Sequence, residues 1–543
     1  MTHPSIPHLI LAAVAFLLGV SECSASTNVP EDTSFACKAV SVSSLSQTAN
    51  SPAAASAVSI PPGQIDAAIH ALDGIVQDRL ARTGVPGIAI AVVHNDVVVY
   101  AKGFGVREVG TDKKVDENTV FLLASISKPV GATVIAKVVG KGKVQWNTPV
   151  VKHLRNFELS SPYATRNVTL GDLYSHRSGL PDHAGDLLED LGFGRTEILR
   201  RLRFEPLAPF RATYAYTNFG VTAAAEAVAK SEGMAWEELS KQVLYRPLGM
   251  TSTSSRFSDY DNSPNKALLH VRVGDHWEAK YTRRPDSQSP AGGVSSSIAD
   301  MAKWLRLQLA NGKFNGQEII NAKALIQTRC PYMMSNAPDT SISRASFYGL
   351  GMGIAYDEAG RVRFSHSGAF ALGAATTIAM LPSEKLGIVA LTNGMPVGLP
   401  EAVISSFLDL VELGSVQRDW LALYGSLFAQ LFQNPSRLAN QTPLANPAPP
   451  KANSAYDGTY LNSYYGSARI VERSQGLVML LGPKHLEFPL KHWDDNTFSY
   501  IPTGENADGI SAVDFTAGSG GRFRTMMIEN LNENKLGTFT RDR

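Results

Sequence analysis

Strand patterns at both ends of a long helical stretch constrain the fold of this chain more than any other feature. The segment "GIAIAVVHNDVVVYAKG", residues 87–103, predicts two strands joined by a turn at His94-Asn95-Asp96. Strand character returns near residues 362–392, and the residues between have mostly helical periodicity. This order predicts an α+β fold, in which one antiparallel sheet is flanked by helices and an inserted helical region.

The N-terminal residues predict an export signal. An apolar run over residues 8–20 is followed by the small residues 24–26, and it is too short to span a bilayer comfortably. We therefore expect a signal peptide at 1–26, a periplasmic or secreted protein, and no integral membrane span once the signal is removed. Because no Lys or Arg precedes the run, an uncleaved membrane anchor is the alternative. Residues 27–60 are rich in Ser, Ala, Thr and Pro and are predicted to be a flexible leader.

The remaining chain divides by composition into three parts. We expect the main domain at 61–415, a helix and a Pro-rich linker at 416–453, and a small all-β domain at 454–543. The last part has short strand patterns separated by turns, which is typical of a small β-barrel or β-sandwich. The linker predicts that this domain folds separately and lies outside any catalytic machinery.

Charge and cysteine content exclude several classes of partner. The 543 residues carry a formal net charge of +1, with no basic tract, so we expect no nucleic acid partner. No Cys/His cluster has the spacing of a zinc site, and we expect neither a metal nor another cofactor. His176 and His183 lie in the loop sequence "SHRSGLPDH" and are predicted to order that loop. Whether Cys37 and Cys330 form a disulfide, and the oligomeric state, are left open.

Ser125 and Lys128 lie one helical turn apart at the head of the apolar segment "FLLASISKPVGATVIAKVV". A lysine entering a core is unfavourable unless it has partners. Burial lowers the pKa of such a lysine, and a neutral amine on the same helix face can accept the proton of a serine nucleophile. A second Ser-x-x-Lys match begins at Ser263, but it lies in a Pro/Asn-rich loop without a helical pattern. The context therefore favours Ser125 as a nucleophile and Lys128 as its base.

Two further motifs supply the other groups that acyl transfer needs. Tyr216 and Asn218 stand at the entry to a predicted helix, where a phenol can relay a proton and an amide can contact a substrate. His366 and Gly368 lie on a predicted strand, "VRFSHSGAF". Gly368 is expected to let a substrate approach the strand edge, and the backbone N–H of Ala369 to act as an oxyanion donor.

The ordered set Ser-x-x-Lys, Tyr-x-Asn and His-x-Gly resembles the serine β-lactamase and penicillin-binding-protein superfamily, over about residues 65–415. Within it, the chain is most similar to the class C β-lactamase-like branch, which includes DD-peptidases, D-aminopeptidases and family VIII esterases. Further matching stretches are "TLGDLYSHRSGLP", "LYRPLGMTST", "AGGVSSSIADMAKWL" and "LTNG". The resemblance implies a β-lactamase/transpeptidase-like fold for residues 61–415, with a small appended β-domain.

The resemblance also implies roles for the site residues. Ser125 is then the nucleophile, Lys128 its partner base and Tyr216 a second proton-transfer group, although Lys128 and Tyr216 can exchange these roles within the superfamily. Asn218 is implied as a substrate contact. His366 stands where many relatives have the lysine of a Lys-Thr-Gly motif, and we expect it to be partly charged near neutral pH.

These features lead to several expectations about function. The leading one is an exported serine hydrolase that forms an acyl-enzyme on amide bonds of short peptides, including peptides with D or unusual residues such as linearised microcystin. A β-lactamase or a carboxylesterase using the same site is the nearest alternative. An alternative of another class is a penicillin sensor that is acylated and does not turn over.

Overall fold

The computed structural model describes residues 58–507, 509–518 and 522–542. The predicted signal peptide and Cys37 lie outside these ranges, so export stays a prediction and the pairing of Cys37 with Cys330 stays an open question. Within the described ranges, no helix combines the length and the apolar character needed to cross a bilayer.

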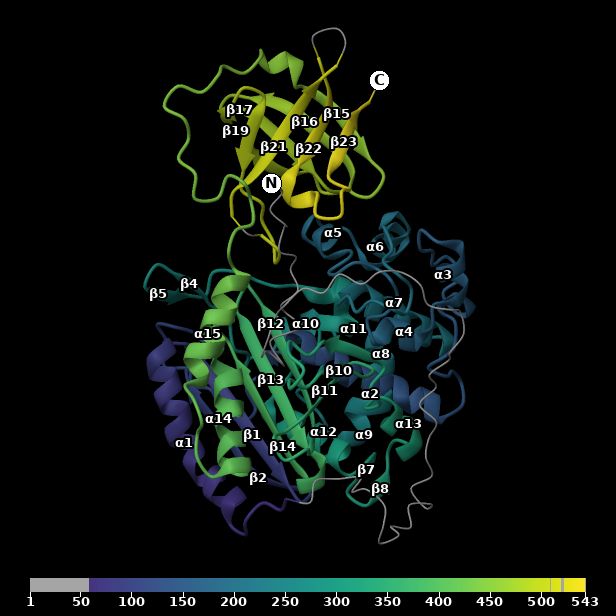
Figure 1. Ribbon diagram of the computed structural model, residues 1–543, viewed down its shortest axis with the longest axis vertical. Helices are drawn as coiled ribbons and strands as arrows, with labels where there is room; N and C mark the ends of the chain where they lie inside the picture. Colours follow the sequence, from purple (N-terminus) through teal and green to yellow (C-terminus); the bar gives the residue numbers. More distant parts are fainter. Residues whose placement is uncertain (1–57, 508, 519–521, 543) are drawn as a thin grey trace.

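An eight-stranded antiparallel sheet forms the centre of the larger domain (Figure 1). Its order is β2-β1-β14-β13-β12-β11-β10-β9, so the first strands of the chain pair with strands from the far end of the domain. This pairing confirms the α+β fold with one antiparallel sheet. The strands are β1 (Gly87–His94), β2 (Val97–Gly105), β9 (Met333–Asn336), β10 (Ser346–Tyr348), β11 (Gly353–Tyr356), β12 (Val362–Phe370), β13 (Ala374–Leu381) and β14 (Leu386–Thr392).

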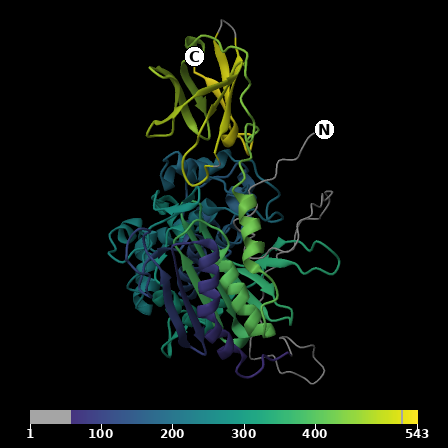
Figure 2. The same ribbon diagram turned by 90° about the vertical axis from the view of Figure 1, so that its left-hand side faces the viewer.

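Helices cover both faces of the sheet (Figures 1 and 2). On one face, α1 (Gln64–Thr83) and α14 (Leu399–Leu413) pack together and bury an apolar cluster against the strands. Helix α15 (Trp420–Leu431) packs on α14 as an outer layer. On the other face, α12 (Ile298–Leu309) lies against β1 and β14. Because both faces are covered, the central strands β1, β13 and β14 are buried along almost their whole length and are mostly apolar, without a regular alternation of apolar and polar residues.

The helical region between β2 and β9 contains short helices and three two-stranded ribbons. The ribbons pair β3 (Phe121–Leu122) with β6 (Ser295–Ser296), β4 (Val271–Val273) with β5 (His276–Glu278), and β7 (Lys313–Phe314) with β8 (Gln317–Glu318). The helices are α2 (Ser127–Gly140), α3 (Pro162–Asn167), α4 (Leu170–Tyr174), α5 (Asp186–Asp190), α6 (Arg195–Arg201), α7 (Asn218–Ser231), α8 (Trp236–Ser240), α9 (Arg246–Leu248), α10 (Phe257–Asp261), α11 (Ser289–Gly292) and α13 (Ala322–Gln327).

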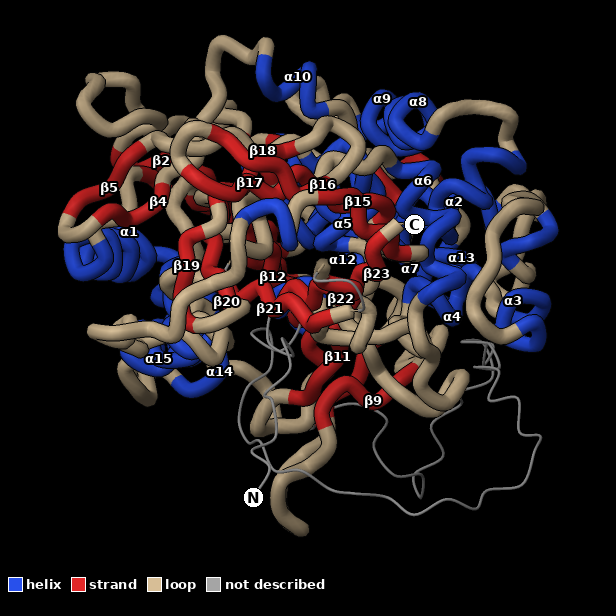
Figure 3. Tube along the Cα trace, turned by 90° about the horizontal axis from the view of Figure 1, so that it is seen from above, coloured by secondary structure: helices blue, strands red, loops and turns tan. Residues whose placement is uncertain are grey.

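The C-terminal residues form a second, all-β domain, here called the C-terminal barrel (residues 454–542). Nine antiparallel strands make one nearly closed sheet in the order β18-β17-β16-β15-β23-β22-β21-β20-β19 (Figure 3). This confirms the predicted small all-β domain. The strands are β15 (Gly458–Asn462), β16 (Gly466–Arg473), β17 (Gly476–Leu481), β18 (Leu486–Pro489), β19 (Lys491–Asp494), β20 (Thr497–Tyr500), β21 (Ser511–Ala517), β22 (Phe523–Ile528) and β23 (Thr538–Arg541).

The C-terminal barrel sits above α5 and α6 and packs against the larger domain (Figure 1). One buried apolar cluster contains Leu191 and Phe193 from the larger domain together with Tyr464 and Tyr465 from the barrel. Residues 432–452, which connect the two domains, have neither helix nor strand. The composition of a linker describes only the connecting segment. It does not show which surfaces of the two domains pack together, so the sequence did not reveal this shared core. Whether the barrel folds by itself stays a prediction.

Candidate active site

Ser125 lies in a tight turn between a strand and a helix. The short strand β3 leads into a 3₁₀ turn, Ala124–Ile126, and α2 begins two residues after Ser125. Ala124 has φ +47°, in the left-handed region that residues with a Cβ rarely adopt. Such strain is found at functional sites that the surrounding structure holds in place. Ser125 is half-buried whereas its neighbours in the turn are buried, so the turn presents this side chain toward the surface.

Lys128 is fully buried one helical turn further on. Its Nζ lies 3.0 Å from Ser125 Oγ, 2.7 Å from Asn218 Oδ1 and 3.0 Å from the carbonyl oxygen of Ala291. Burial lowers the pKa of Lys128 to about 7, and the carboxylate of Asp186 opposes part of that change. A neutral amine in this place donates its two hydrogens to the two carbonyl oxygens, and its lone pair faces the Ser125 hydroxyl.

Tyr216 lies beside the same amine. The Nζ of Lys128 is 4.4 Å from the centre of the Tyr216 ring. The Tyr216 hydroxyl is buried, and no group among the described residues makes a hydrogen bond of normal geometry with it. Burial raises its pKa well above the ordinary value, and the nearby Ser125 hydroxyl lowers it by less. The group is therefore a neutral phenol next to the Ser125 hydroxyl.

The loop that precedes Tyr216 in the chain holds the Tyr-x-Asn segment in position. The ring Nδ1 of His176 accepts a hydrogen bond from the N–H of Thr217 at 3.1 Å, and the N–H of His183 donates to the carbonyl of Tyr216 at 2.8 Å. These contacts support the expected loop-ordering role of both histidines. No cluster of metal-ligating side chains occurs in the part of the chain that the structure describes.

Asp186 is a residue of the candidate site that the sequence did not reveal. Its Oδ2 accepts from the amide nitrogen of Asn218 at 2.8 Å, and it also lies 2.9 Å from His183 Nδ1. The first of these bonds orients the Asn218 amide, so that its oxygen points to Lys128. No sequence motif marks Asp186, and only the fold brings it 2.8 Å from a residue 32 positions away.

His366 is buried on β12 and uses both ring nitrogens. Nδ1 donates to the carbonyl of Ser367 at 2.6 Å, so Nε2 accepts from the Tyr348 hydroxyl at 2.7 Å. The pKa of His366 is lowered to about 3, mainly by burial and in smaller part by the nearby Lys128, against the opposing effect of the bond to Ser367. The expectation that this histidine is partly charged near neutral pH is therefore wrong, because it rested on the pKa of an exposed imidazole. Tyr348, the hydrogen-bond partner of His366, lies in no recognisable sequence motif, so it could not be predicted from the sequence.

Gly368 brings β12 against the turn of the nucleophile. A Cβ at this position would lie 2.4 Å from the carbonyl oxygen of Leu123 and 2.8 Å from the backbone nitrogen of Ser125. Glycine is thus required at position 368 because two backbones approach each other closely there. From the sequence we had expected instead that Gly368 lets a substrate approach the strand edge. Ala369 follows on the same strand, so the strand carrying its N–H lies beside the Ser125 turn.

The structure therefore brings the predicted site residues together. Ser125, Lys128 and Asn218 are joined by hydrogen bonds, and the rings of Tyr216 and His366 lie 6.5 Å apart. The second Ser-x-x-Lys match lies elsewhere: its lysine, Lys266, pairs with Asp261 at 3.0 Å in an exposed loop.

Comparisons with known proteins agree with this geometry. The family model Beta-lactamase matches residues 72–406, and a domain of unknown function (DUF3471) matches residues 442–538. The chain is 27% identical over 431 residues to Unguisins hydrolase ungD of Aspergillus violaceofuscus, covering 73% of this chain and 75% of the relative. It is 23% identical over 337 residues to the D-alanyl-D-alanine-carboxypeptidase/endopeptidase AmpH of Escherichia coli K12, covering 61% and 85%.

Two solved structures share the fold. The octameric penicillin-binding protein homologue from Pyrococcus abyssi aligns with a TM-score of 0.55 at 19% identity, covering 85% of this chain and 98% of that one. A class C beta lactamase from Rhodobacter sphaeroides aligns with a TM-score of 0.51 at 21% identity, covering 62% and 98%. Because the family model matches more than half of the chain, and the fold agrees, the chain belongs to the Beta-lactamase family and is a serine hydrolase.

Proposed function

We propose that the protein is an exported serine hydrolase that cleaves amide bonds of short peptides through an acyl-enzyme on Ser125. One observation carries the proposal: a fully buried lysine lies 3.0 Å from the hydroxyl of a half-buried serine, and burial brings the pKa of that lysine to about 7. A lysine in this state can act as a base at neutral pH.

In the proposed reaction, Lys128 Nζ takes the proton of the Ser125 hydroxyl as Oγ attacks the substrate carbonyl carbon. The carbonyl oxygen becomes the oxyanion of a tetrahedral intermediate, which the backbone N–H groups of Ser125 and Ala369 stabilise. When the C–N bond breaks, the leaving amine takes a proton and the acyl group stays on Ser125. Water then attacks the ester, and the serine hydroxyl forms again as the acid product leaves.

Tyr216 is proposed as the group that passes the proton to the leaving amine. Burial raises the pKa of its phenol, so the group is neutral, and no group among the described residues makes a hydrogen bond of normal geometry with its hydroxyl. A neutral phenol is a poor base, which favours Lys128 over Tyr216 as the base, and it can pass its proton to the amine while it takes one from the protonated Lys128. Asn218 holds Lys128 and is proposed to contact the substrate as well.

The proposed substrate class follows from the neutral state of His366. Where many relatives place a lysine that holds the carboxylate of a β-lactam, this chain has an imidazole without charge at neutral pH. The carboxypeptidase/endopeptidase name of one relative also favours amide bonds over esters. The apolar N-terminal residues motivate export, and peptides with D or unusual residues are the candidates within the class.

A panel of substrates on one preparation tests this proposal. Turnover of short D-residue peptides should exceed that of nitrocefin and of short esters by roughly tenfold or more in kcat/KM, which equals about 1.4 kcal/mol in transition-state binding. Faster nitrocefin or ester turnover would overturn the peptidase assignment. An adduct that persists in the intact mass without turnover would identify a sensor instead.

A fluorophosphonate probe tests the nucleophile. Ser125→Ala should remain unlabelled and lose turnover by about 10⁴-fold or more. Ser263→Ala, which removes the serine of the second Ser-x-x-Lys match, is the matched control and should be labelled like the wild type. Equal labelling of wild type and Ser125→Ala would contradict the assignment.

A further inference from the structure

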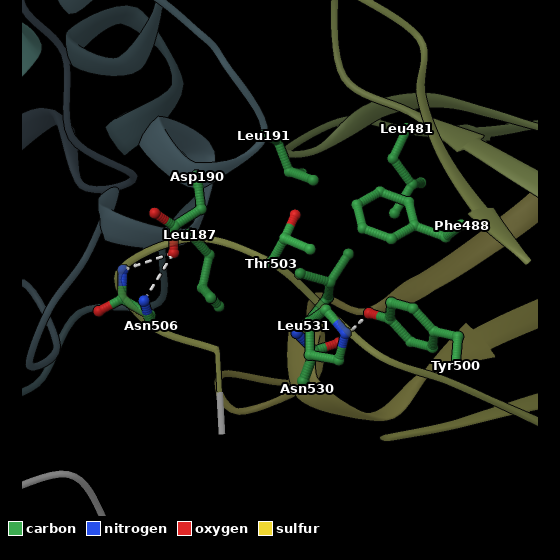
Figure 4. A pocket seen from close by; sticks show the side chains of 11 residues that line it. Leu187, Asp190, Leu191, Leu481, Phe488, Tyr500, Thr503, Asn506, Asn530 and Leu531 are labelled. Atoms are coloured by element: carbon green, nitrogen blue, oxygen red, sulfur yellow. Dashed lines mark hydrogen bonds between the residues drawn. The ribbon is translucent and has the colours of Figure 1, made fainter. Parts of the chain in front are cut away.

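A loop of the C-terminal barrel that contains residues 504–506 forms hydrogen bonds with the larger domain at the end of α5. The Oδ2 of Asp190 accepts from the Asn506 backbone N–H at 2.9 Å and from its side-chain amide at 2.8 Å (Figure 4). The Oδ1 of Asp190 accepts from the N–H of Glu505 at 3.0 Å. Gly504, with φ +121°, permits this approach, because a Cβ there would lie 2.4 Å from Asp190 Cγ. The gap beside these residues holds a cavity of only about 20 Å³, so the two surfaces are closely packed.

Glu505 of this loop reaches the strand of the candidate active site. Its Oε1 accepts from the N–H of Ala371 at 2.5 Å, directly after β12 ends at Phe370. Its Oε2 lies 3.7 Å from Nε of Arg283, whose guanidinium is 5.0 Å from the Phe370 ring centre. The side chain of Glu505 is 12% exposed. A largely buried carboxyl group of the barrel therefore holds the residue that follows the strand carrying Ala369.

The same loop reaches the other side of the site through α5. This helix is a single turn, in which Asp186 binds Asn218 and Asp190 binds the barrel loop. Asn218 in turn holds Lys128 at 2.7 Å. The loop thus contacts both the strand proposed to supply an oxyanion donor and the helix that orients the partner of the base.

We infer that Glu505 is a positioning residue for acyl transfer: from the C-terminal barrel, its carboxyl group fixes the backbone N–H of Ala369 relative to Ser125 by holding Ala371. The inference rests on the proposed function, since it assigns Ser125 as nucleophile and Ala369 as donor. It also means that the barrel helps to position the active-site residues, whereas the linker composition had predicted a domain outside any catalytic machinery. Oxyanion donors act only near their productive distance, so a small shift of β12 lowers the rate of acylation without removing any group that touches the substrate.

The charge balance around Glu505 shows which substitution keeps this function. Three carboxyl groups, those of Glu189, Asp190 and Glu505, surround the single guanidinium of Arg283. Burial raises the pKa of Glu505 to about 8, against the opposing effect of Arg283. At neutral pH the group is thus largely protonated. A glutamine reproduces the oxygen that accepts from Ala371 and has no charge.

The experiment compares Glu505 variants of the full chain by fluorophosphonate labelling. The end point of labelling gives the fraction of active sites, and the rate constant is then expressed per active site. Glu505→Ala should be labelled about 10–100-fold more slowly than the wild type, and Glu505→Gln within about threefold of it. Asn534→Ala is the matched control: it removes a different interdomain bond, 3.1 Å long, to Glu205. It should lower the melting temperature and leave the labelling rate per site unchanged.

The following outcomes would overturn the inference. A wild-type rate per site in Glu505→Ala would show that the residue only joins the two domains, and a slow Glu505→Gln would show that the acceptor oxygen is not what matters. If Glu505→Ala does not fold, Glu505→Asp replaces it, because it keeps the carboxyl group but withdraws it by one methylene; it should be slow, and a wild-type rate would overturn the inference. Failure of the proposed function is distinguishable, since the wild type would then not be labelled at Ser125.

Discussion

At the scale of single residues, burial decides the protonation states on which the proposed chemistry depends. Lys128 and His366 are both basic groups in the same buried site, and burial lowers the pKa of each. The result for Lys128 is a pKa of about 7, near the pH at which a base must work, whereas His366 is neutral across the physiological range. Lys128 can therefore act as the proposed base, whereas His366 is a neutral group whose hydrogen bond links β12 to Tyr348.

The pH dependence of acylation should follow Lys128. Because only the neutral amine accepts the Ser125 proton, kcat/KM should rise about tenfold per pH unit below pH 7 and level off above it. Lys128→Met should lower kcat/KM by roughly 10³-fold or more. Lys128→Arg should be as inactive, since a guanidinium stays protonated. Measuring kcat/KM between pH 5 and 9 checks this, and an active arginine variant would contradict Lys128 as the base.

His366 should show no titration between pH 5 and 8, because burial holds its pKa near 3. Nitrogen chemical shifts of the labelled imidazole measure this directly. Tyr348→Phe removes the hydroxyl that donates to Nε2 and should lower kcat/KM about fivefold, the value of one hydrogen bond of about 1 kcal/mol. Tyr214→Phe is the control, since Tyr214 lies in the same aromatic cluster, with ring centres 5.8 Å from Tyr348. A change of equal size in both variants would argue against a specific role for the Tyr348 hydroxyl.

At the scale of elements, the site is made where a strand meets a turn. Strand β12 approaches the Ser125 turn so closely that its residue at the contact has no Cβ. β13 supports this strand on one side through continuous pairing, whereas β11 pairs with it only as far as Ser365. Beyond Ser365, the edge of β12 that would face β11 is therefore unpaired with that strand, and β12 there lies against the turn that carries Ser125.

Gly368→Ala should separate these two elements. The added methyl group would meet the Leu123 carbonyl oxygen at 2.4 Å, so the strand or the turn has to move. We expect a loss of kcat/KM of about 10²-fold, together with a lower melting temperature. Gly74→Ala, on an exposed position of α1 with nothing near its Cβ, is the control and should stabilise the protein by about 0.5–1 kcal/mol. Full activity in Gly368→Ala would contradict the close approach.

At the scale of the whole molecule, buried carboxyl groups lie where the two domains meet. Glu205 is 1% exposed and accepts from Asn534 of the barrel at 3.1 Å. Burial raises its pKa from 4.5 to about 7, against the opposing bonds to Tyr464 and Asn534. Between these two pH values the folded protein binds more protons than the unfolded chain, so this group makes the fold less stable as the pH rises through that window.

Glu205→Gln should remove this dependence. The amide keeps an acceptor for Asn534 and does not ionise. The melting temperature of the variant minus that of the wild type should therefore increase as the pH rises from 5 to 8. Thermal unfolding at several pH values measures the difference. Glu487→Gln, at an exposed carboxyl group of the same barrel, should show no such trend. A constant difference for Glu205→Gln across this range would contradict the raised pKa.

The sequence by itself determined the elements and the local chemistry of this protein. The i and i+3 spacing of Ser125 and Lys128 places them on one helix face, and the turn at residues 95–96 follows from residues that tolerate positive φ. Such features depend on neighbours along the chain, which a sequence displays. Only the tertiary structure decided the roles of Asp186, Tyr348 and Glu505 and the charge state of His366. Glu505 is 134 residues from Ala371 in the chain, and a pKa depends on which groups fold over it and exclude water. Contacts and burial of this kind arise only when distant elements pack, so no local pattern records them.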